Sequence, residues 1–454
     1  MFSLSVTFSK RLDTCQTEMS TFRAQSAVAV LYPFRHLLAL GLILLVGVGL
    51  RAAWLAYVNV DPNDGRFDDT LFYYNSANLL ARGFGYITPY GGGEPTAQWP
   101  PGYTGLLALI YLLGGKSLFA VKALNVGLAM VSIVLTYLLA SRLFDRRVGL
   151  LAALLLAAFP SYVYLSTLVL AENLFIPAFL LAVLLMVHWG TGGRQPTALQ
   201  SLAVGAVIAF SALVRVEGLW LLAPALVVWL VASHGWARAV QQVLLVLVGA
   251  AVILTPWTVR NAIQLDEFIL VRSASAQSLA TGLNPDYKLY RKSLGLELPR
   301  PSLSETLRIH RDGPWRPFPL LGHKIHDLYK NDSEILLWVR GDGPNPSLTD
   351  EDFDRWGNIA NAAYFWVGAV ALLGLAMSLV KRNAGVLVLT AVVATWTLGF
   401  ALFVPETRYH LPLLPLLSVF AAAPMVWLLP KAVTVEGLAD PASGEEPAPR
   451  LPGG

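Results

Sequence analysis

The stretch VGLLAALLLAAFPSYVYLSTLVLAENLFIPAFLLAVLLMVHW, residues 148–189, decides the fold class. Its one charged residue is Glu172, and each apolar half has about the 20 residues that a helix needs to cross ~30 Å of hydrocarbon. The apolar residues run continuously, whereas the strands of a membrane barrel alternate apolar and polar residues. The stretch therefore predicts two transmembrane helices, near 148–168 and 172–189, joined by a tight turn.

The same pattern recurs along the whole chain. Of its 454 residues, 55% are hydrophobic and only 14% are charged, against about 25% charged in ordinary soluble domains. We therefore predict an all-α polytopic membrane protein. Its transmembrane helices, about ten in number, are expected at 36–58, 118–141, 148–168, 172–189, 198–214, 218–233, 240–257, 358–380, 384–403 and 409–430.

Basic residues in the short turns predict the orientation. Arg146 and Arg147 follow the second predicted span, and Lys381 and Arg382 follow the eighth. Cytoplasmic loops are enriched in Lys and Arg, so we place these turns and both chain ends in the cytoplasm, with the protein in the inner or plasma membrane. The same clustering accounts for the net charge of +4, and we predict no nucleic-acid partner.

This topology divides the chain into regions. The 258–357 segment is too polar for a membrane and follows an odd number of spans, so it should lie outside. Its Pro, Gly and Trp residues and short helical patterns predict a small ordered domain or cap. The full division is a cytoplasmic tail at 1–35, a transmembrane catalytic module at 36–257 with an outer loop at 59–103, the cap at 258–357, three further spans at 358–430, and a disordered cytoplasmic tail at 431–454.

The first outer loop carries two adjacent carboxylates, Asp68 and Asp69. Asp favours a helix N-terminus and Gly83 favours a helix end, so we predict a short interfacial helix at about 69–82. A second apolar stretch, 104–114, is too short to cross the membrane and predicts another interfacial helix. The carboxylates suit acid–base chemistry on a substrate presented by lipid. A plain helix cap with solvated charges is an equally good interpretation.

Further charged residues fall at the outer ends of the predicted helices. Such residues are costly near a bilayer, and are usually paired or functional. Carboxylates suit a hydroxyl acceptor, and guanidinium groups suit a phosphate. A structural network of Arg–Glu pairs is the alternative, and it fits Arg215 with Glu217 better than Arg260 or Arg408, which have no obvious local partner beyond Glu406. For Lys122 the alternative is a side chain that extends to the interface. The set comprises Lys122, Glu172, Arg215, Glu217, Arg260, Glu406, Arg408 and His410.

Five motifs in order carry a family resemblance. They are Asp69, Tyr73 and Ala77 with Gly83–Phe84–Gly85–Tyr86; Pro100–Pro101–Gly102–Tyr103; Ala171–Glu172–Asn173–Leu174–Phe175; Pro256–Trp257–Thr258–Val259–Arg260–Asn261 followed by Gly282–Leu283–Asn284–Pro285; and Glu406–Thr407–Arg408–Tyr409–His410–Leu411–Pro412. Over roughly residues 36–425 the chain resembles the bacterial relatives of the protein O-mannosyltransferases and of the lipid A aminoarabinose transferase. These are membrane-embedded C-type glycosyltransferases that use polyprenyl-phosphate sugars.

The resemblance implies an activity and a site. It implies an inverting transfer of a sugar from a polyprenyl-phosphate donor to an acceptor on the extracytoplasmic face, where the acceptor is a lipid, glycan or protein. Asp69 maps to the family's catalytic carboxylate, although Asp68 stays open as the acid, and Glu172 would orient the acceptor, the donor sugar or a catalytic Arg. Residues expected to contact substrate are Tyr73, Arg82, Lys122, Arg215, Arg260, Asn261, Arg408, Tyr409 and His410.

Some alternatives stay open at this stage. No cofactor is certain, and a divalent metal between the carboxylates is neither required nor excluded. A transporter or flippase of lipid-linked sugars would also explain the spans and charges. We see neither an inverted repeat nor a broken mid-span helix in the sequence, and these are features that transporters often have. A non-catalytic assembly protein of the same family is the third candidate.

Overall fold

The computed structural model describes residues 35–63, 68–284, 317–341, 347–381 and 383–428, together with positions 304 and 308. The predicted tails, the side chain of Asp68 and much of the predicted cap lie outside the described residues. The helices are α2 (Arg35–Tyr57), α3 (Asp68–Ala81), α4 (Pro101–Gly114), α5 (Leu118–Leu143), α6 (Arg146–Ala158), α7 (Pro160–Tyr164), η2 (Leu165–Thr167), α8 (Glu172–Gly190), α9 (Ala198–Val214), η3 (Val216–Leu221), α10 (Leu222–Ala232), α11 (Trp236–Leu265), α12 (Ser275–Leu283), α15 (Pro317–Tyr329), α16 (Ile335–Arg340), α17 (Asp350–Val380), α18 (Ala384–Leu402), η4 (Thr407–Leu413) and α19 (Leu414–Trp427).

The chain is an all-α polytopic membrane protein. Seven helices of the described part are long and apolar enough to cross a membrane, namely α2, α5, α8, α11, α17, α18 and the continuous η4–α19. The bent pair α6 and α7–η2 would make an eighth. The predicted spans 198–214 and 218–233 form as helices, but both belong to shorter apolar segments of 10–17 residues. The count of ten spans therefore stays a prediction.

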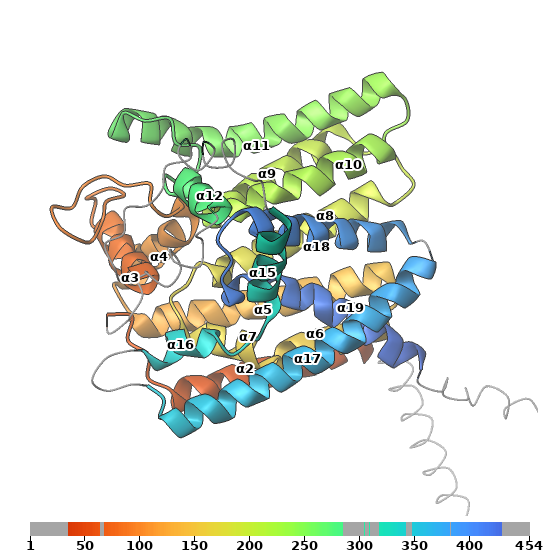
Figure 1. Cartoon of the computed structure of the whole chain (residues 1–454), viewed down its shortest axis with the longest axis horizontal. Coiled ribbons are helices and arrows are strands. Elements are labelled where there is room, and N and C mark those ends of the chain that lie inside the picture. Colours follow the sequence, from red (N-terminus) through yellow and green to blue (C-terminus); the bar gives the residue numbers. More distant parts are fainter. Residues whose placement is uncertain are drawn as a thin grey trace, which may run out of the picture.

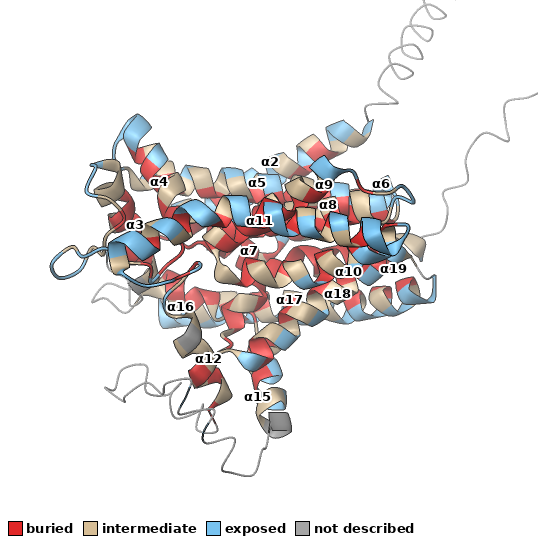
Figure 2. Ribbon diagram, turned by 90° about the horizontal axis from the view of Figure 1, so that it is seen from above, coloured by how far each residue is buried: buried red, intermediate tan, exposed pale blue. Residues whose placement is uncertain are grey.

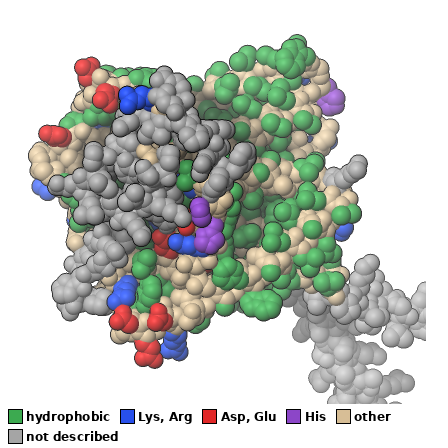
Figure 3. All heavy atoms as spheres, viewed as in Figure 1, with side chains coloured by type: hydrophobic (Ala, Val, Ile, Leu, Met, Phe, Trp, Pro, Cys, Tyr) green, Lys and Arg blue, Asp and Glu red, His purple; other side chains and the backbone are tan. Residues whose placement is uncertain are grey.

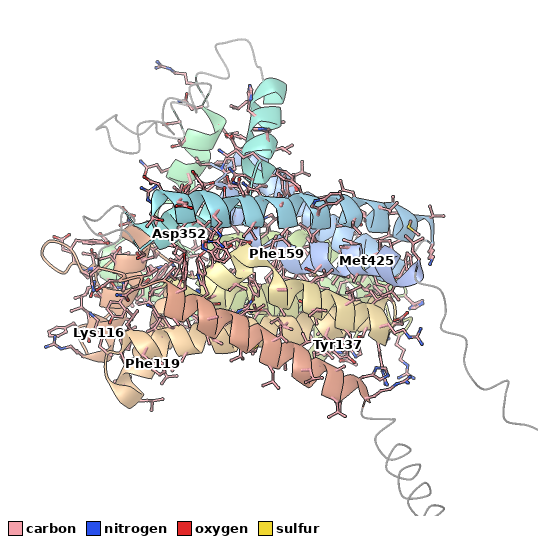
Figure 4. All side chains as sticks on the ribbon, turned by 90° about the horizontal axis from the view of Figure 1, so that it is seen from below. Lys116, Phe119, Tyr137, Phe159, Asp352 and Met425 are labelled. Carbon is pink, nitrogen blue, oxygen red and sulfur yellow. The ribbon has the colours of Figure 1, made fainter. Side chains whose placement is uncertain are left out.

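The long helices lie roughly side by side, and the short helices α3 and α4 of the first outer loop lie at one end of them (Figure 1). Helices α3, α4 and α16 are at this end, and α12 and α15 project from the side of the bundle (Figure 2). Lys116 and Asp352 lie at the same end, whereas Tyr137 and Met425 lie toward the other (Figure 4). On the face that Figure 3 shows, hydrophobic side chains are spread over the part away from the first end, as expected of a surface in contact with lipid.

Small residues allow the closest helix contacts. Helices α9 and α11 pack together over a long interface. A Cβ atom at Gly205 would collide with the carbonyl oxygen of Val246, and one at Gly249 with that of Leu202. Close backbone approach through glycine is a common way for membrane helices to associate, since apolar side chains gain little by leaving lipid. These two glycines fix α9 against α11, and so set the position of the loop after α9.

One predicted span is broken, contrary to the sequence analysis. Helix α6 ends at Ala158 and α7 begins at Pro160, with a bend of 62° between the two parts. Proline cannot donate a backbone hydrogen bond and disrupts the preceding turn. The fully buried Arg51 of α2 fills the break, because its Nη1 donates to the carbonyl of Ala157 at 3.0 Å and its Nη2 to that of Tyr162 at 3.4 Å. The freed carbonyl groups are thus satisfied within the protein.

The first outer loop contains both short helices that the sequence predicts. Helix α3 begins one residue before the predicted start, and the chain leaves it through Gly83 at φ +86°, a conformation that favours glycine. Helix α4 begins at Pro101, and its C-cap is Gly115. Helices α3 and α4 pack against each other. This packing holds the first turn of α3, with Asp69, near the end of the bundle.

Candidate active site

Asp69 and Arg408 meet at the end of the bundle where α3 lies. Nη2 of Arg408 donates to Oδ2 of Asp69 at 2.8 Å, across 339 residues of sequence. Nε of the same guanidinium donates to Oε2 of Glu406 at 2.7 Å, and the ring of Trp338 lies 3.9 Å from its central carbon. Oδ1 of Asp69 accepts a hydrogen bond from Nε1 of Trp99 at 2.8 Å. The predicted catalytic carboxylate is therefore held by one guanidinium and one indole.

A second arginine extends this network. Arg215 lies between α9 and η3, and its Nη1 donates to Oε1 of Glu172 at 2.5 Å. Its Nη2 donates to Oε1 of Glu217 at 3.2 Å. Nη1 of Arg408 lies 3.8 Å from the same oxygen of Glu172, and the Tyr409 ring lies 4.7 Å from the central carbon of Arg215. Glu172, the first residue of α8, thus lies between the two guanidinium groups.

The carboxylates of the network differ in their access to solvent. The side chain of Asp69 is 26% exposed and that of Glu406 is 30% exposed, whereas those of Glu172 and Arg408 are 2% and 5% exposed. A buried charge needs a partner, and Glu172 has one in Arg215. A substrate can therefore reach Asp69, while Glu172 can act on it only through the arginines.

The surroundings of Asp69 keep it ionised. Burial acts to raise the pKa of this carboxyl, but the charge of Arg408 and the hydrogen bonds from Arg408 and Trp99 outweigh that effect. The pKa of Asp69 therefore lies below its ordinary value, since both neighbours stabilise the charged form. Asp69 is a carboxylate at neutral pH, ready to accept a hydrogen bond from a hydroxyl or an amine.

One expectation about the arginines needs correction, and the role of Arg260 stays a prediction. From the sequence, Arg408 has no obvious acidic partner beyond Glu406, but in the structure it also pairs with Asp69 and lies near Glu172. The sequence also offers Arg260 for a phosphate. In the structure both terminal nitrogens of Arg260 donate to backbone carbonyls of the first loop, to Thr96 at 2.8 Å and to Tyr86 at 2.6 Å. Arg215 does pair with Glu217, as the alternative of a structural Arg–Glu network predicts.

Other predicted contact residues lie outside the network. His410 is buried, with Nε2 at 2.8 Å from Oδ1 of the equally buried Asp332. Burial raises the pKa of Asp332, although the hydrogen bond with His410 opposes this. Asn261 is fully buried and donates to the carbonyl of Ile269 at 3.0 Å. Both side chains are committed to internal bonds that tie the helix ends to neighbouring loops.

Three more predicted residues have local partners. Lys122 donates from Nζ to the carbonyl of Val60 at 3.0 Å. The guanidinium of Arg82 lies 5.4 Å from the ring of Phe84. Tyr73 is buried beside the ring of Tyr103. Their roles in substrate binding stay predictions, as does that of Asp68.

The structure adds residues to the site that the sequence analysis does not propose. Trp99 belongs to the Gln98–Tyr103 run, where an aromatic residue between polar and proline residues could have indicated it. Trp338 and Arg272 lie in the divergent outer segment, where no repeated pattern marks them. Among the described residues, no three His, Cys, Asp or Glu side chains are grouped as a metal site would require. We therefore assign no metal ligands.

Comparison with known proteins finds a family profile that matches part of the chain. Residues 98–259 match the sequence profile of the family described as dolichyl-phosphate-mannose-protein mannosyltransferase. No curated protein matches the chain in a whole-sequence search. The matched range includes Trp99, Glu172 and Arg215, and thus part of the network.

Solved structures share the fold at low sequence identity. The oligosaccharyltransferase of Archaeoglobus fulgidus in the apo form superposes with a TM-score of 0.55 at 15% identity, over 86% of this chain and 50% of that one. ArnT of Cupriavidus metallidurans in the apo state superposes with a TM-score of 0.52 at 15% identity, over 86% of this chain and 60% of that one. The chain spans about half to three fifths of the length of these proteins. The resemblance that the motifs indicated thus extends to a family profile over residues 98–259 and to the fold of these two structures.

Proposed function

We propose that the protein transfers a sugar from a polyprenyl-phosphate donor to an acceptor at the extracytoplasmic face of the membrane, using Asp69 to receive the acceptor proton. The observation that carries the proposal is the solvent-accessible Asp69 carboxylate, oriented by Arg408 and Trp99 at the end of a membrane bundle. An acid that is both accessible and fixed in orientation is what a positioned base requires. The domain division predicted from the sequence, with 36–257 as the catalytic module, is part of this proposal.

The reaction is a single displacement. The acceptor oxygen or nitrogen attacks the anomeric carbon, its proton passes to Asp69, and the bond from that carbon to the phosphate oxygen breaks with inversion. The polyprenyl phosphate leaves with an additional negative charge. Cationic side chains near the departing phosphate stabilise this charge as it develops. Because the pKa of Asp69 is lowered, proton transfer is favourable only once the acceptor atom has begun to bond to carbon and its acidity has risen.

The broken span does not favour a transporter. In transporters, broken helices expose backbone carbonyl groups to a substrate or ion at mid-membrane. Here Arg51 occupies the carbonyl groups of Ala157 and Tyr162 at the break. These two carbonyl groups at the break are therefore already bonded within the protein.

The test is a transfer assay with the purified full chain in detergent or nanodiscs. A panel of synthetic polyprenyl-phosphate sugars is offered with membrane extract as the source of acceptor, and release of polyprenyl phosphate is measured. Release that requires both the acceptor and an intact Asp69 supports the proposal. If donors cross the bilayer of proteoliposomes unchanged, and no polyprenyl phosphate is released, the protein is a transporter.

A further inference from the structure

Arg408 lies near the start of η4, and η4 is held by a segment of the chain that joins α15 to α16. We call residues 324–338 the clamp segment; they include the second half of α15, the connection and the first residues of α16. Helix α15 packs on η4 and on α18, and α16 packs on α7 and α17. The clamp segment therefore contacts the helices on both sides of the loop that contains Glu406.

The first residue of η4 is bonded to the clamp segment through both its backbone and its side chain. The backbone N–H of Thr407 donates to Oε2 of Glu334 at 3.0 Å, and its hydroxyl group donates to the carbonyl of Asp327 at 3.2 Å. The first N–H groups of a helix have no acceptor within the helix, so Glu334 supplies one. Thr407 is fully buried, and the residue directly before Arg408 is thereby fixed.

His410, two residues after Arg408, is bonded through both ring nitrogens. Nδ1 lies 3.0 Å from the carbonyl oxygen of Leu328, and Nε2 lies 2.8 Å from Oδ1 of Asp332. A carbonyl oxygen can only accept, so Nδ1 carries a proton. One further proton lies between Nε2 and Asp332, and the pair has no net charge whichever of the two groups holds it. The buried pair therefore leaves no unpaired charge inside the protein.

Helix α17 fixes the His410–Asp332 pair in turn. Oδ1 of Asn361 accepts from the backbone N–H of Asp332 at 2.8 Å and from that of Ser333 at 3.0 Å. The ring of Tyr364, also on α17, stacks on the imidazole of His410 with 4.7 Å between the ring centroids. A group is held precisely when its neighbours are themselves locked by packing and hydrogen bonds. The pair thus ties η4 to a long helix of the bundle.

The two ends of the clamp segment make further contacts near Arg408. Nζ of Lys324 donates to the carbonyl groups of Ala401 and Leu402 at 3.0 and 3.1 Å. These are among the last carbonyl groups of α18, which have no donor within the helix. At the other end of the segment, the ring of Trp338 lies over the guanidinium of Arg408. The clamp segment therefore limits the movement of the loop and of the guanidinium itself.

The bond between Arg408 and Asp69 needs this support. Glu406 is in the same loop as Arg408 and moves with it, so the bond between them does not fix the loop. The bond to Asp69, 2.8 Å long, joins the loop to α3, and it weakens steeply when its geometry is lost. A misplacement of about 1 Å in a catalytic arrangement can cost on the order of 10²-fold in rate.

We propose that the clamp segment positions Arg408 for the reaction, and that the His410–Asp332 pair is its central contact. Both side chains are 1% exposed, so substrate cannot reach them. They are positioning residues that act through Arg408, which in turn orients Asp69. The proposal rests on the proposed function, since it assigns these residues a part in that reaction, but the hold on η4 can be measured without the reaction.

The test compares Asp332→Ala with Asp332→Asn in the full chain in detergent. Alanine leaves Nε2 of His410 without a partner, whereas the asparagine amide can donate to Nε2 while Nδ1 keeps its proton. We expect Asp332→Ala to lower kcat about 10- to 100-fold, the range of a lost charge-assisted bond, with little change in KM for the donor. Backbone amides of residues 403–413 should exchange with deuterium faster by a similar factor. Asp332→Asn should restore most of both.

A second pair of variants covers the case in which the buried substitution prevents folding. Glu334 is only half-buried. Glu334→Ala removes the acceptor for the Thr407 N–H and should show both effects more weakly, whereas Glu334→Gln keeps an acceptor and should show neither. The matched control is Tyr329→Phe in the same segment, which loses a bond of 2.6 Å to the hydroxyl of Thr397 on α18 but no bond to η4. It should lower the apparent melting temperature without changing kcat or the exchange of 403–413.

Three results would overturn the proposal. The first is wild-type kcat in both alanine variants, Asp332→Ala and Glu334→Ala. The second is a loss of kcat in Tyr329→Phe as large as theirs, since the effect would then be general destabilisation. The third is an equal loss in Asp332→Asn and Asp332→Ala. A wild-type chain that releases no polyprenyl phosphate would instead contradict the proposed function, and the exchange measurement would still decide whether the clamp segment holds η4.

Discussion

Replacing Asp69 by Asn is the most direct test of the proposed chemistry. The substitution keeps the size of the side chain but removes its charge and its ability to take a proton. One oxygen can still accept from Trp99 at the present 2.8 Å. The new NH₂ group then faces Nη2 of Arg408, which now lies 2.8 Å from Oδ2, so two donors meet.

The expected loss has two parts. The charge-assisted bond to Arg408 contributes about 1.5–3 kcal/mol, or about 10- to 100-fold if it only positions the carboxylate. Removal of a general base costs a further ~10²–10⁴ in rate. We therefore expect kcat to fall by at least about 1,000-fold, with little change in the binding of a polyprenyl-phosphate probe.

Two controls separate these parts. Glu406→Gln removes another bond to Arg408, 2.7 Å long, but leaves Asp69 intact, so its effect should not exceed the positioning part. Asp68→Asn removes the neighbouring carboxylate, and we expect a far smaller loss than at Asp69. The assay is release of polyprenyl phosphate from a defined donor, with membrane insertion checked by size-exclusion chromatography. If Asp69→Asn turns over at the wild-type rate, or Asp68→Asn is the inactive variant, the assignment of the base is wrong.

Three further predictions concern topology, pH and stability. In a Cys15→Ser background, cysteines at positions 63 and 302 should both react with a membrane-impermeant reagent from outside intact cells, and protection of either would contradict the topology. A lowered pKa shifts the ionisation of a base to lower pH, so the acid limb of kcat/KM should lie below pH ~3.9, the ordinary Asp value; a limb near neutral pH would point to another group. Burial lowers the pKa of Lys324 to about 7. Above that pH the unfolded chain therefore binds more protons than the folded one. The free energy of unfolding then rises with pH until the lysine of the unfolded chain also loses its proton. The apparent melting temperature of wild type relative to Lys324→Met should therefore increase between about pH 7 and pH 9, and an unchanged difference would refute this origin.

The sequence predicts the helices well because hydrophobic periodicity and length are local properties. Helices α5 and α8 and the short helix α3 form within about two residues of their expected bounds. The predicted bounds 240–257 and 358–380 are wrong, because α11 runs from Trp236 to Leu265 and α17 begins at Asp350, so both helices continue into the polar segment. The bend at Pro160 was missed because a single proline within an apolar stretch is also compatible with a gentle kink. The buried Arg51 gave no signal of its own, since a lone arginine within a span can equally face a lipid headgroup.

The pairing of the charged residues could not be predicted in the same way. Because successive spans cross the membrane in opposite directions, the sequence predicts that Glu172, Arg215 and Arg408 lie at the same end of the bundle. Which arginine meets which acid depends on side-chain reach across tertiary contacts, as the bond between Asp69 and Arg408 illustrates. Arg260 has the sequence context of a phosphate ligand, yet it binds backbone carbonyl groups. Only a three-dimensional arrangement distinguishes these two uses of a guanidinium.

The network also explains how a strongly paired carboxylate can take part in proton transfer. Asp69 shares Arg408 with Glu406 and Glu172, so no single carboxylate neutralises that guanidinium. When Asp69 accepts a proton, Arg408 keeps two carboxylate neighbours, and its buried charge is not left unpaired. The neighbouring carboxylates also oppose the lowering of the Asp69 pKa by Arg408, because nearby like charges disfavour its ionised form. Glu172, which substrate cannot reach, would thus serve the reaction by keeping Arg408 and Arg215 in place while the charge on Asp69 changes.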